Sequence, residues 1–455
     1  IFSVVAESFT NHAGPAVIIS FLIAGVVCGA AVMCYAEFAS MIPVAGSAYT
    51  FTYTTVGEIV AWVIGWDLIL EMLMAGSVVS KYWGVYLNQF FELIGWNINT
   101  NIAIGSFNFD LAPVIIVAFF TALLVMGTKI GARVDGALTI LKIAIVVFIV
   151  VVGFFYIKAE NFTPFIPPSE PAASTDGSGV SAVMEQPLWQ WATGMAPSIY
   201  GVTGIISGAA LVFFAFLGFD VVATASEETI NPKKNVPLGI GVGLGLIIVL
   251  YTLVAIVTTG MVSYKDLAKQ SDPSLAVAFK MVGADWAAKI ISLGIVIGMA
   301  TVVMVLLLGL TRVVFAMSRD GLLPRGLSHT GKHGTPVRLQ IIVGVVMALI
   351  AACCNVGILS DMVNIGTLSA FTLVAISIPI MRKKRPDLER SFKIPGNPWV
   401  PILIALANLW LMVNLSVLTW IRFVVWLIVG FAIYFGYGYR HARLGAGELE
   451  VAAQE

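Results

Sequence analysis

The stretch GAALVFFAFLGFDVVATASEET, residues Gly208–Thr229, decides the fold. It begins as an apolar run, is interrupted by a small residue and an acid at Gly218 and Asp220, and continues as a weakly apolar half. Lipid offers the backbone no hydrogen-bond partners, so irregular backbone at membrane depth persists only inside protein or beside a wet cavity. The pattern therefore predicts a discontinuous helix broken near Phe214–Gly218. The alternative is a continuous helix in which Asp220 faces a neighbouring span.

The composition of the whole chain agrees with a membrane protein. The 455 residues are 59% hydrophobic and only 11% charged, and the mean hydropathy is +0.96. A soluble surface needs far more charge. Apolar runs of about twenty residues recur from end to end, which predicts a polytopic, all-α membrane protein. The formal net charge of zero argues against a nucleic-acid partner.

Twelve spans are expected, and the first of them, Ile1–Ala6, is read as truncated. Glu7–Gly14 is interpreted as a polar loop, and Lys265–Ala284 as an amphipathic surface helix. We divide this single transporter domain, residues 1–455, into a first repeat (1–156), an extracellular loop (157–203), a second repeat (204–381) and two extra helices (399–441). The other spans are expected at Ala16–Ala39, Ile59–Phe91, Leu111–Met126, Val134–Tyr156, Gly208–Thr229, Leu238–Thr259, Ile290–Val314, Leu339–Ala352, Leu359–Ile380, Val400–Thr419 and Phe423–Phe435.

The basic residues predict the orientation in the membrane. Arg382, Lys383, Lys384 and Arg385 lie in a linker that also holds Arg390, and further lysines and arginines fall on the same face. The positive-inside rule then places both termini in the cytoplasm. The expected location is the plasma membrane, with the lipid bilayer as a partner and a monomeric state.

Three ionisable residues stand at depths where charge is costly. A lysine at the centre of a span costs about 2.5–3.5 kcal/mol, and Lys142 lies too deep for a simple end anchor. It is either a structural ion-pair or snorkelling residue, or a titratable group that can lose its proton during a cycle. Asp220 is either a backbone acceptor or a coupling acid. Glu71 follows Asp67 by one turn, so the two acids share a helix face.

Catalytic and metal signatures are missing from the sequence. The four cysteines and four histidines show no ligand spacing, and no phosphate loop or nucleophile motif occurs in a fitting context. We expect neither an enzyme nor a metal site, and no cofactor.

Three stretches resemble the amino acid–polyamine–organocation transporters, and most of all the bacterial relatives of the cationic amino acid transporters. They are YAEFASMIPVAGSAYTFTY, FFAFLGFDVVATASEETINPKKNVPLGI and TRVVFAMSRDGLLP, and the GWDLILE run and Lys142 support that branch. The resemblance implies the LeuT-like fold, with two inverted five-helix repeats, broken first and sixth helices, and two further helices.

The same resemblance implies roles for single residues. In the family the substrate carboxylate binds at a break of the first helix, which would lie immediately before Ile1. The substrate amino group binds to backbone carbonyls of the broken sixth helix, which match Phe214, Ala215 and Leu217, next to Gly218. Phe214 also matches the aromatic residue that covers the substrate. Lys142 matches the lysine that replaces the second sodium ion, so no sodium is expected. Met304, on the eighth helix, is our candidate for the pocket wall.

Together these features predict a secondary transporter that imports L-amino acids with protons by alternating access. A pocket wall at Met304 without charge favours small neutral substrates such as alanine, because a thioether cannot neutralise a guanidinium. Transport of arginine or lysine is the alternative, with Glu71 as the acid, as is proton-independent exchange. A solute-gated channel or membrane sensor is the rival from another class; a channel should show a continuous polar stripe.

Overall fold

The structure is a computed structural model of the whole chain. It describes all residues except 42–48, 51, 54–56, 97–99, 105–106, 128–131, 173–181, 220–230, 271–272, 332–334, 388–389, 391 and 443–455.

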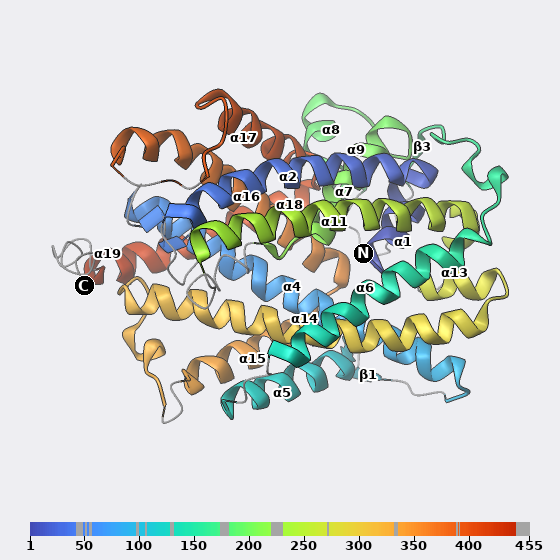
Figure 1. Cartoon of the computed structure of the whole chain (residues 1–455), viewed down its shortest axis with the longest axis horizontal. Helices are drawn as coiled ribbons and strands as arrows, with labels where there is room; N and C mark the ends of the chain where they lie inside the picture. The colour runs from blue at the N-terminus through green and yellow to red at the C-terminus, as the bar shows by residue number, and fades with distance from the viewer. Residues whose placement is uncertain are drawn as a thin grey trace.

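The described chain is predominantly helical (Figure 1). The α-helices are α1 (Val4–Ser8), α2 (Val17–Met41), α4 (Glu58–Leu93), α5 (Leu111–Val125), α6 (Ala132–Phe154), α7 (Ala182–Glu185), α8 (Leu188–Thr193), α9 (Gly201–Val212), α11 (Pro232–Met261), α12 (Tyr264–Leu267), α13 (Leu275–Met281), α14 (Asp285–Arg319), α15 (Val337–Cys353), α16 (Val356–Lys384), α17 (Trp399–Met412), α18 (Val417–Ile433) and α19 (Tyr439–His441). The π-helical segments are η1 (Phe9–Ala13) and η7 (Tyr434–Gly438), and the 3-10 segments are η2 (Gly14–Ala16), η3 (Ala159–Phe162), η4 (Phe213–Phe216) and η6 (Arg325–Ser328). Two antiparallel pairs join β1 (Asn101–Ile104) to β2 (Phe107–Asp110) and β3 (Glu170–Pro171) to β4 (Ser198–Ile199).

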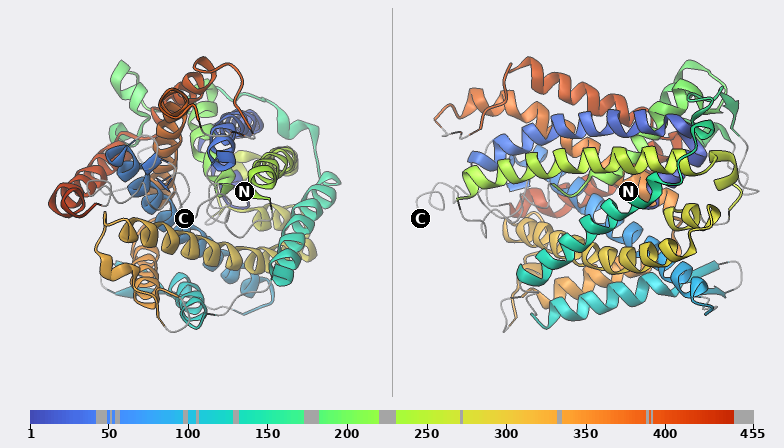
Figure 2. Two further views of the ribbon diagram at one scale, coloured as in Figure 1. Left: turned by 60° about the vertical axis from the view of Figure 1, so that its left-hand side comes forward. Right: turned by 45° about the vertical axis from the view of Figure 1, so that its right-hand side comes forward.

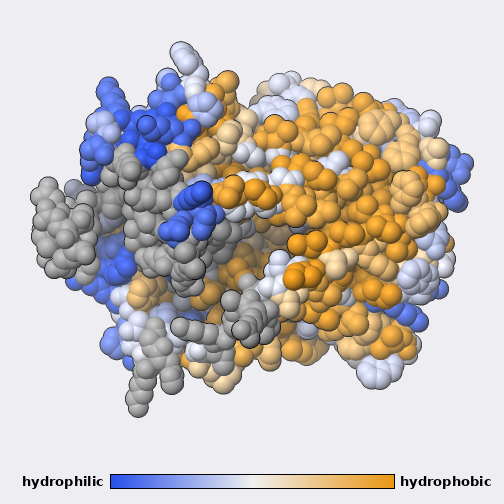
Figure 3. All heavy atoms as spheres, viewed as in Figure 1, coloured by the Kyte–Doolittle hydropathy of each residue, from blue (hydrophilic) through white to orange (hydrophobic). Residues whose placement is uncertain are grey.

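The molecule has the build of a multi-pass membrane protein. Seven helical stretches in the described part are long and apolar enough to cross a bilayer, and α5, the segment Gly201–Phe216, α15 and α17 are shorter apolar helices. The long helices run along the longest axis of the molecule (Figure 1). On the face seen in Figure 3, an apolar surface lies between two polar ends. Such a band is what a bilayer requires, because its core solvates apolar side chains and excludes charge.

Helix α4 is the central element of the bundle. Most of its residues from Ala61 to Tyr86 are buried, and α14, α15 and α16 pack around it. Trp66, in the GWDLILE run, stacks on Trp426 of α18 at 4.4 Å between ring centroids, and its Nε1 donates to the Trp426 carbonyl. In the left panel of Figure 2, α17 and α18 lie at the outside of the bundle. Trp66 is therefore a packing residue that joins α4 to α18.

Small residues bring α9 close to the N-terminal helices. A Cβ on Gly208 would lie 2.9 Å from the Ser8 hydroxyl and 3.0 Å from that of Ser20. Ser20 Oγ donates to the Ile205 carbonyl of α9 at 2.8 Å. Tight contact through glycine and serine is the usual way in which helices associate in lipid, where apolar burial gives no driving force. This contact fixes the position of α9, which carries the predicted break.

The sequence motifs meet at the ends of the helices. Glu37, in α2, is fully buried, and both of its carboxylate oxygens accept bonds from Arg382 at the end of α16, at 2.8 and 2.6 Å. The Ile394 amide also donates to this carboxylate, at 2.8 Å. Tyr49 donates to Asp320 at 2.9 Å. The motifs around Glu37 and Asp320 therefore tie distant helix ends together.

Three sequence predictions about local structure are wrong. Glu7–Gly14 is largely helical rather than a loop, because its polar groups find partners within the bundle; Thr10 Oγ1, for example, donates to the Ala6 carbonyl. Lys265–Ala284 holds two short helices, α12 and α13, instead of one. The span expected to end at Thr419 ends at Met412, because Ser416 caps a new helix by accepting from the Thr419 amide.

Candidate functional site

The predicted break of the membrane helix is confirmed. Helix α9 ends at Val212, and the chain tightens into the 3-10 segment η4. Leu217 then adopts an extended conformation with φ −70° and ψ 153°, and Gly218 has a φ of +117°. The backbone at this point cannot continue the ladder of helical hydrogen bonds. Regular helix ends within the Phe214–Gly218 segment that the sequence indicated.

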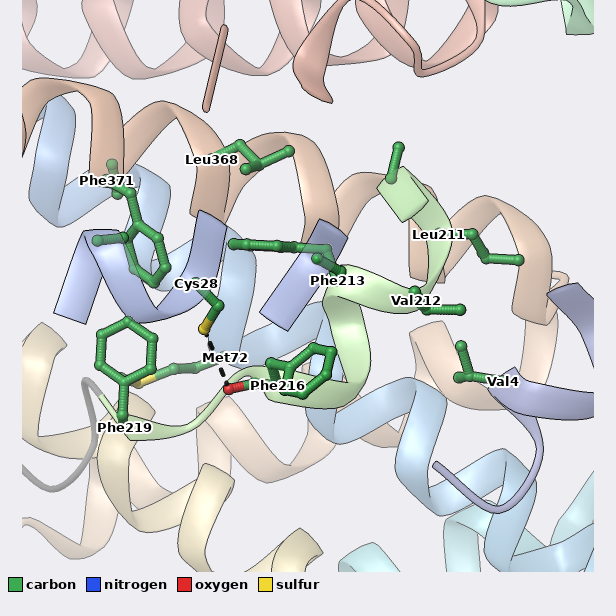
Figure 4. Packing of buried hydrophobic residues seen from close by; sticks show 14 of the residues in the cluster. Val4, Cys28, Met72, Leu211, Val212, Phe213, Phe216, Phe219, Leu368 and Phe371 are labelled. Carbon is green, nitrogen blue, oxygen red and sulfur yellow. Dashed lines mark hydrogen bonds between the residues drawn. The ribbon is translucent and has the colours of Figure 1, made fainter. Parts of the chain in front are cut away.

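The break leaves backbone carbonyls exposed to other partners. The Phe214 carbonyl accepts a long bond of 3.4 Å from the Leu217 amide. The Phe216 carbonyl accepts from the Cys28 thiol at 3.8 Å, as the dashed line in Figure 4 shows. Within the described residues, no donor reaches the carbonyl oxygens of Ala215 and Leu217. Two carbonyl oxygens near the break therefore have no donor among the described residues, at a depth where unsatisfied groups are costly.

Gly218 offers a direct test of the break. A side chain at φ +117° is strained whatever space surrounds it, so we expect Gly218→Ala to destabilise the protein by about 1–3 kcal/mol. Thermal unfolding in detergent measures the change. Gly239→Ala is the matched control, because Gly239 lies in α11, has open space around it and has no unusual φ; it should be neutral or stabilising. Equal effects of the two substitutions would contradict the account of the break.

The head of the first helix lies beside this break. In Figure 4, Val4 at the start of α1 lies near Val212 at the end of α9, and the two helices are in contact. The N-terminus lies in the middle of the bundle in every view of Figures 1 and 2. Ile1, a predicted site residue, is half-buried and packs against the main core. The structure therefore brings the start of α1 and the break of α9 together.

Phe214 and Leu217 face a small apolar cluster. They pack with Ala75 and Val78 of α4, and with Leu359 and Val363 of α16. Glu71 precedes Ala75 by one helical turn, so the two residues share a face of α4. Its side chain is only 3% exposed. The acid that the sequence singled out is thus buried one turn away from the cluster that contacts the break.

Lys142 lies against α14. A Cβ on Gly298 would be 3.1 Å from Lys142 Cγ and 3.9 Å from its Cδ and Cε, so the aliphatic part of the lysine crosses this glycine. Met304 follows Gly298 by six residues on α14, about 9 Å along the helix. Met304 is half-buried and packs against the main core, as does Ala215. The structure thus associates Lys142 and Met304 with one helix, α14, and a direct contact of Met304 with a substrate stays a prediction.

Asp220 lies outside the described residues, so its two predicted roles stay open.

Sequence reasoning missed Glu7. It lies in α1, and its Oε2 accepts from the Tyr82 hydroxyl of α4 at 2.8 Å. Tyr82 also packs in the apolar cluster with Phe214 and Leu217. The available signal was the run VVAES, in which an acid follows apolar residues at helical spacing. This signal was overlooked because the polar residues after Glu7 suggested a loop.

Comparison with known proteins gives a family match over most of the chain. The model of the family described as "Amino acid permease" matches residues 1–435.

Three relatives show the range of the similarity. The chain is 40% identical to the methylthioribose transporter of Bacillus subtilis (strain 168), over 98% of this chain and 90% of the relative. It is 41% identical to the branched-chain amino acid permease BcaP of the same organism, over 95% of this chain and 88% of the relative. It is 35% identical to the mitochondrial cationic amino acid transporter 3 of Arabidopsis thaliana, over 86% of this chain and 60% of the relative.

Proposed function

Because the chain belongs to the amino acid permease family, we propose that it is a secondary active transporter that imports L-amino acids together with protons by alternating access. The observation that carries the proposal is the helix break near the start of α1, where the carbonyls of Ala215 and Leu217 have no donor among the described residues. Carbonyl oxygens are suitable acceptors for an α-ammonium group, and the start of a helix favours a carboxylate. The two ends of an amino acid are thus matched by two neighbouring backbone elements.

The proposed fold is the LeuT-like arrangement of two inverted five-helix repeats. In this arrangement α1 follows a first break, α9 precedes the second, and α17 and α18 are the additional helices. Discontinuous helices at the interface of such repeats are the usual substrate sites of secondary transporters. We place the protein in the plasma membrane as a monomer, with both termini in the cytoplasm, because the basic linker after α16 lies on that side under the positive-inside rule.

Lys142 is the proposed coupling group. Its aliphatic part crosses α14 at Gly298, and the resemblance matches its ammonium group to the second ion of relatives driven by sodium. A lysine in such a position can exchange a proton in each cycle. This proposal needs neither sodium nor another cofactor.

The proposed substrates are small neutral amino acids. The relative named for branched-chain amino acids supports the neutral class, whereas the relatives named for cationic amino acids support the alternative of arginine or lysine transport. A competition assay with a panel of unlabelled amino acids against labelled alanine tests the choice. If arginine competes better than alanine, the neutral proposal is wrong.

Met304 gives this proposal a residue-level test. Replacing the thioether by a hydroxymethyl group removes volume from the proposed pocket wall, so we expect Met304→Ser to accept longer side chains. Leucine or methionine should then inhibit alanine uptake by the variant about tenfold more strongly than in the unmutated protein, since one or two buried methylenes are worth about 1–3 kcal/mol. Met299→Ser is the matched control, because Met299 lies on the same helix and is also half-buried. An unchanged inhibition profile in Met304→Ser would remove Met304 from the pocket.

A further inference from the structure

A cavity of about 440 Å³ with polar and apolar walls lies beside α7, one helical turn from the helix break. We call it the α7 chamber. It is lined by the η1 segment, α7, the second half of α9, α16 and the turn before α18. Six of its lining residues carry the argument: His12, Glu185, Gln186, Ser207, Asp361 and Asn414. The volume is within the range of small-molecule sites, about 300–1,000 Å³.

The walls of the α7 chamber are fixed by backbone hydrogen bonds. The Leu188 amide donates to the Leu415 carbonyl at 3.0 Å, and the Val417 amide donates to the Gln186 carbonyl at 3.1 Å. On the opposite side, the Tyr200 amide donates to the His12 carbonyl at 2.9 Å. The cavity is therefore a built feature that several helices maintain.

The polar atoms in the α7 chamber are unbalanced towards acceptors. Gln186 is 6% exposed and Asn414 is 5% exposed, and among the described residues no donor reaches Gln186 Oε1 or Asn414 Oδ1. The orientation of the Asn414 side-chain amide is set by its nitrogen, which donates to the Trp410 carbonyl at 2.7 Å. The oxygen of the same amide therefore points the other way. Buried acceptors without donors are uncommon in native proteins and call for a partner.

The charged groups that line the α7 chamber are negative. Glu185 and Asp361 bring two carboxyl groups to its wall, and the described lining contains neither lysine nor arginine. Asp361 Oδ2 accepts from the Thr419 hydroxyl at 2.9 Å. Arg422 of α18 also acts on Asp361, although it is not part of the lining.

The remaining polar groups do not supply a buried cation. His12 contacts the Ser207 hydroxyl through Nδ1 at 3.2 Å. Burial raises the pKa of Tyr200 to about 12, so its phenol stays neutral and donates to the Thr10 carbonyl at 2.6 Å. The cavity thus offers carboxylate and amide oxygens to a donor ligand, together with hydroxyl and amide groups that can donate or accept.

We propose that the α7 chamber is a binding site for a primary ammonium group, held by Glu185 and Asp361 through charge and by Gln186 Oε1 and Asn414 Oδ1 through hydrogen bonds. An ammonium group has three donors and no acceptor, which matches this set of oxygens. Leu211 lines the chamber and lies one turn before Phe214 at the break, so the chamber is a neighbour of the central site. The ammonium group belongs either to a transported amino acid or to a simple amine, and its binding needs no transport activity.

The test is equilibrium binding to the full chain in lipid nanodiscs, measured as stabilisation against heating with ethylamine as the probe and ethanol as its neutral control. A ligand of the folded state raises the unfolding temperature by mass action. We expect ethylamine but not ethanol to stabilise the unmutated protein, and Glu185→Gln to weaken the apparent affinity about tenfold. Glu185 is exposed at the end of α7, so this substitution leaves the fold intact.

Two further variants keep the test decisive. Gln186→Leu removes an acceptor without altering charge, and it should also weaken ethylamine binding. Glu160→Gln changes an exposed acid away from the chamber and should have no effect. An absence of ethylamine binding in the unmutated protein, or equal affinity in all three variants, overturns the proposal.

Labelled alanine distinguishes the two sources of the ammonium group. If the chamber receives the transported amino acid, the unmutated protein binds two alanines and Glu185→Gln binds one. If it receives other amines, both bind one alanine while ethylamine binding still depends on Glu185. Either result supports an ammonium site. Neither requires uptake, so a failure of the proposed transport function would be seen separately.

Discussion

Lys142→Ala is expected to abolish accumulation of alanine against its gradient while retaining binding. One proton moving through 100 mV releases about 2.3 kcal/mol, which supports an accumulation of about fiftyfold at 1.36 kcal/mol per factor of ten. Without the titratable ammonium group of Lys142, whose aliphatic part crosses Gly298, this energy cannot be used. The ratio of internal to external alanine should then fall to about one.

The measurement is uptake of labelled alanine into proteoliposomes with an imposed proton gradient, together with alanine binding to the purified variant. Lys158→Ala is the matched control, because Lys158 is exposed after the end of α6, and it should accumulate alanine normally. Lys142→Arg keeps a positive charge that does not titrate, so it should fail like the alanine variant. Full accumulation by Lys142→Ala would remove this lysine from the coupling mechanism.

Loss of the Glu37 carboxylate is expected to have the largest effect on stability. Glu37 is fully buried, and Arg382 forms two short hydrogen bonds to it while the Ile394 amide forms a third. Arg390 Nε lies 3.8 Å from its Oε1. Removing one partner of a buried ion pair leaves the other charge uncompensated, which costs about 3–5 kcal/mol. Glu37→Ala should lower the free energy of unfolding by that amount.

Thermal unfolding in detergent compares this variant with two others. Asp387→Ala removes an exposed partner of Arg385 and should change stability little, because surface pairs contribute little. The double variant Glu37→Ala with Arg382→Ala should be less destabilised than the sum of its single changes predicts, since no unpaired Arg382 charge remains. Stability of Glu37→Ala equal to that of Asp387→Ala would show that the buried pair does not hold these helix ends together.

Much of the architecture could be predicted from the sequence because membrane helices have strong local signals. Hydropathy located the long helices, and the span expected at Ile59–Phe91 is α4, Glu58–Leu93. The break was predictable because an acid is expensive in lipid, and because Gly218 takes a φ that other residues rarely adopt. The placement of Lys142 in a span followed from spacing alone. Its contact with Gly298 depends on the packing of α6 and α14, which periodicity does not specify.

The rest of the site depends on contacts between distant parts of the chain. Glu7 was assigned to a loop, and only the fold shows that the Tyr82 hydroxyl satisfies its carboxylate inside the bundle. The pairing of Glu37 with Arg382 likewise joins residues far apart in the sequence. The α7 chamber is formed by several segments that are distant in the sequence. The side-chain oxygens of Gln186 and Asn414, which accept no hydrogen bond from the described residues, are buried only when those segments pack together. One sequence supplies the residue types and leaves these pairings undetermined.

Uptake by the unmutated protein in sodium-free proteoliposomes, with and without an inwardly directed proton gradient, tests the central claim most directly. The account predicts that labelled alanine accumulates above its external concentration when the gradient is present and only equilibrates when a protonophore removes it. Equal uptake under both conditions would contradict proton coupling and favour exchange, and an absence of specific amino acid uptake would contradict the proposed function itself.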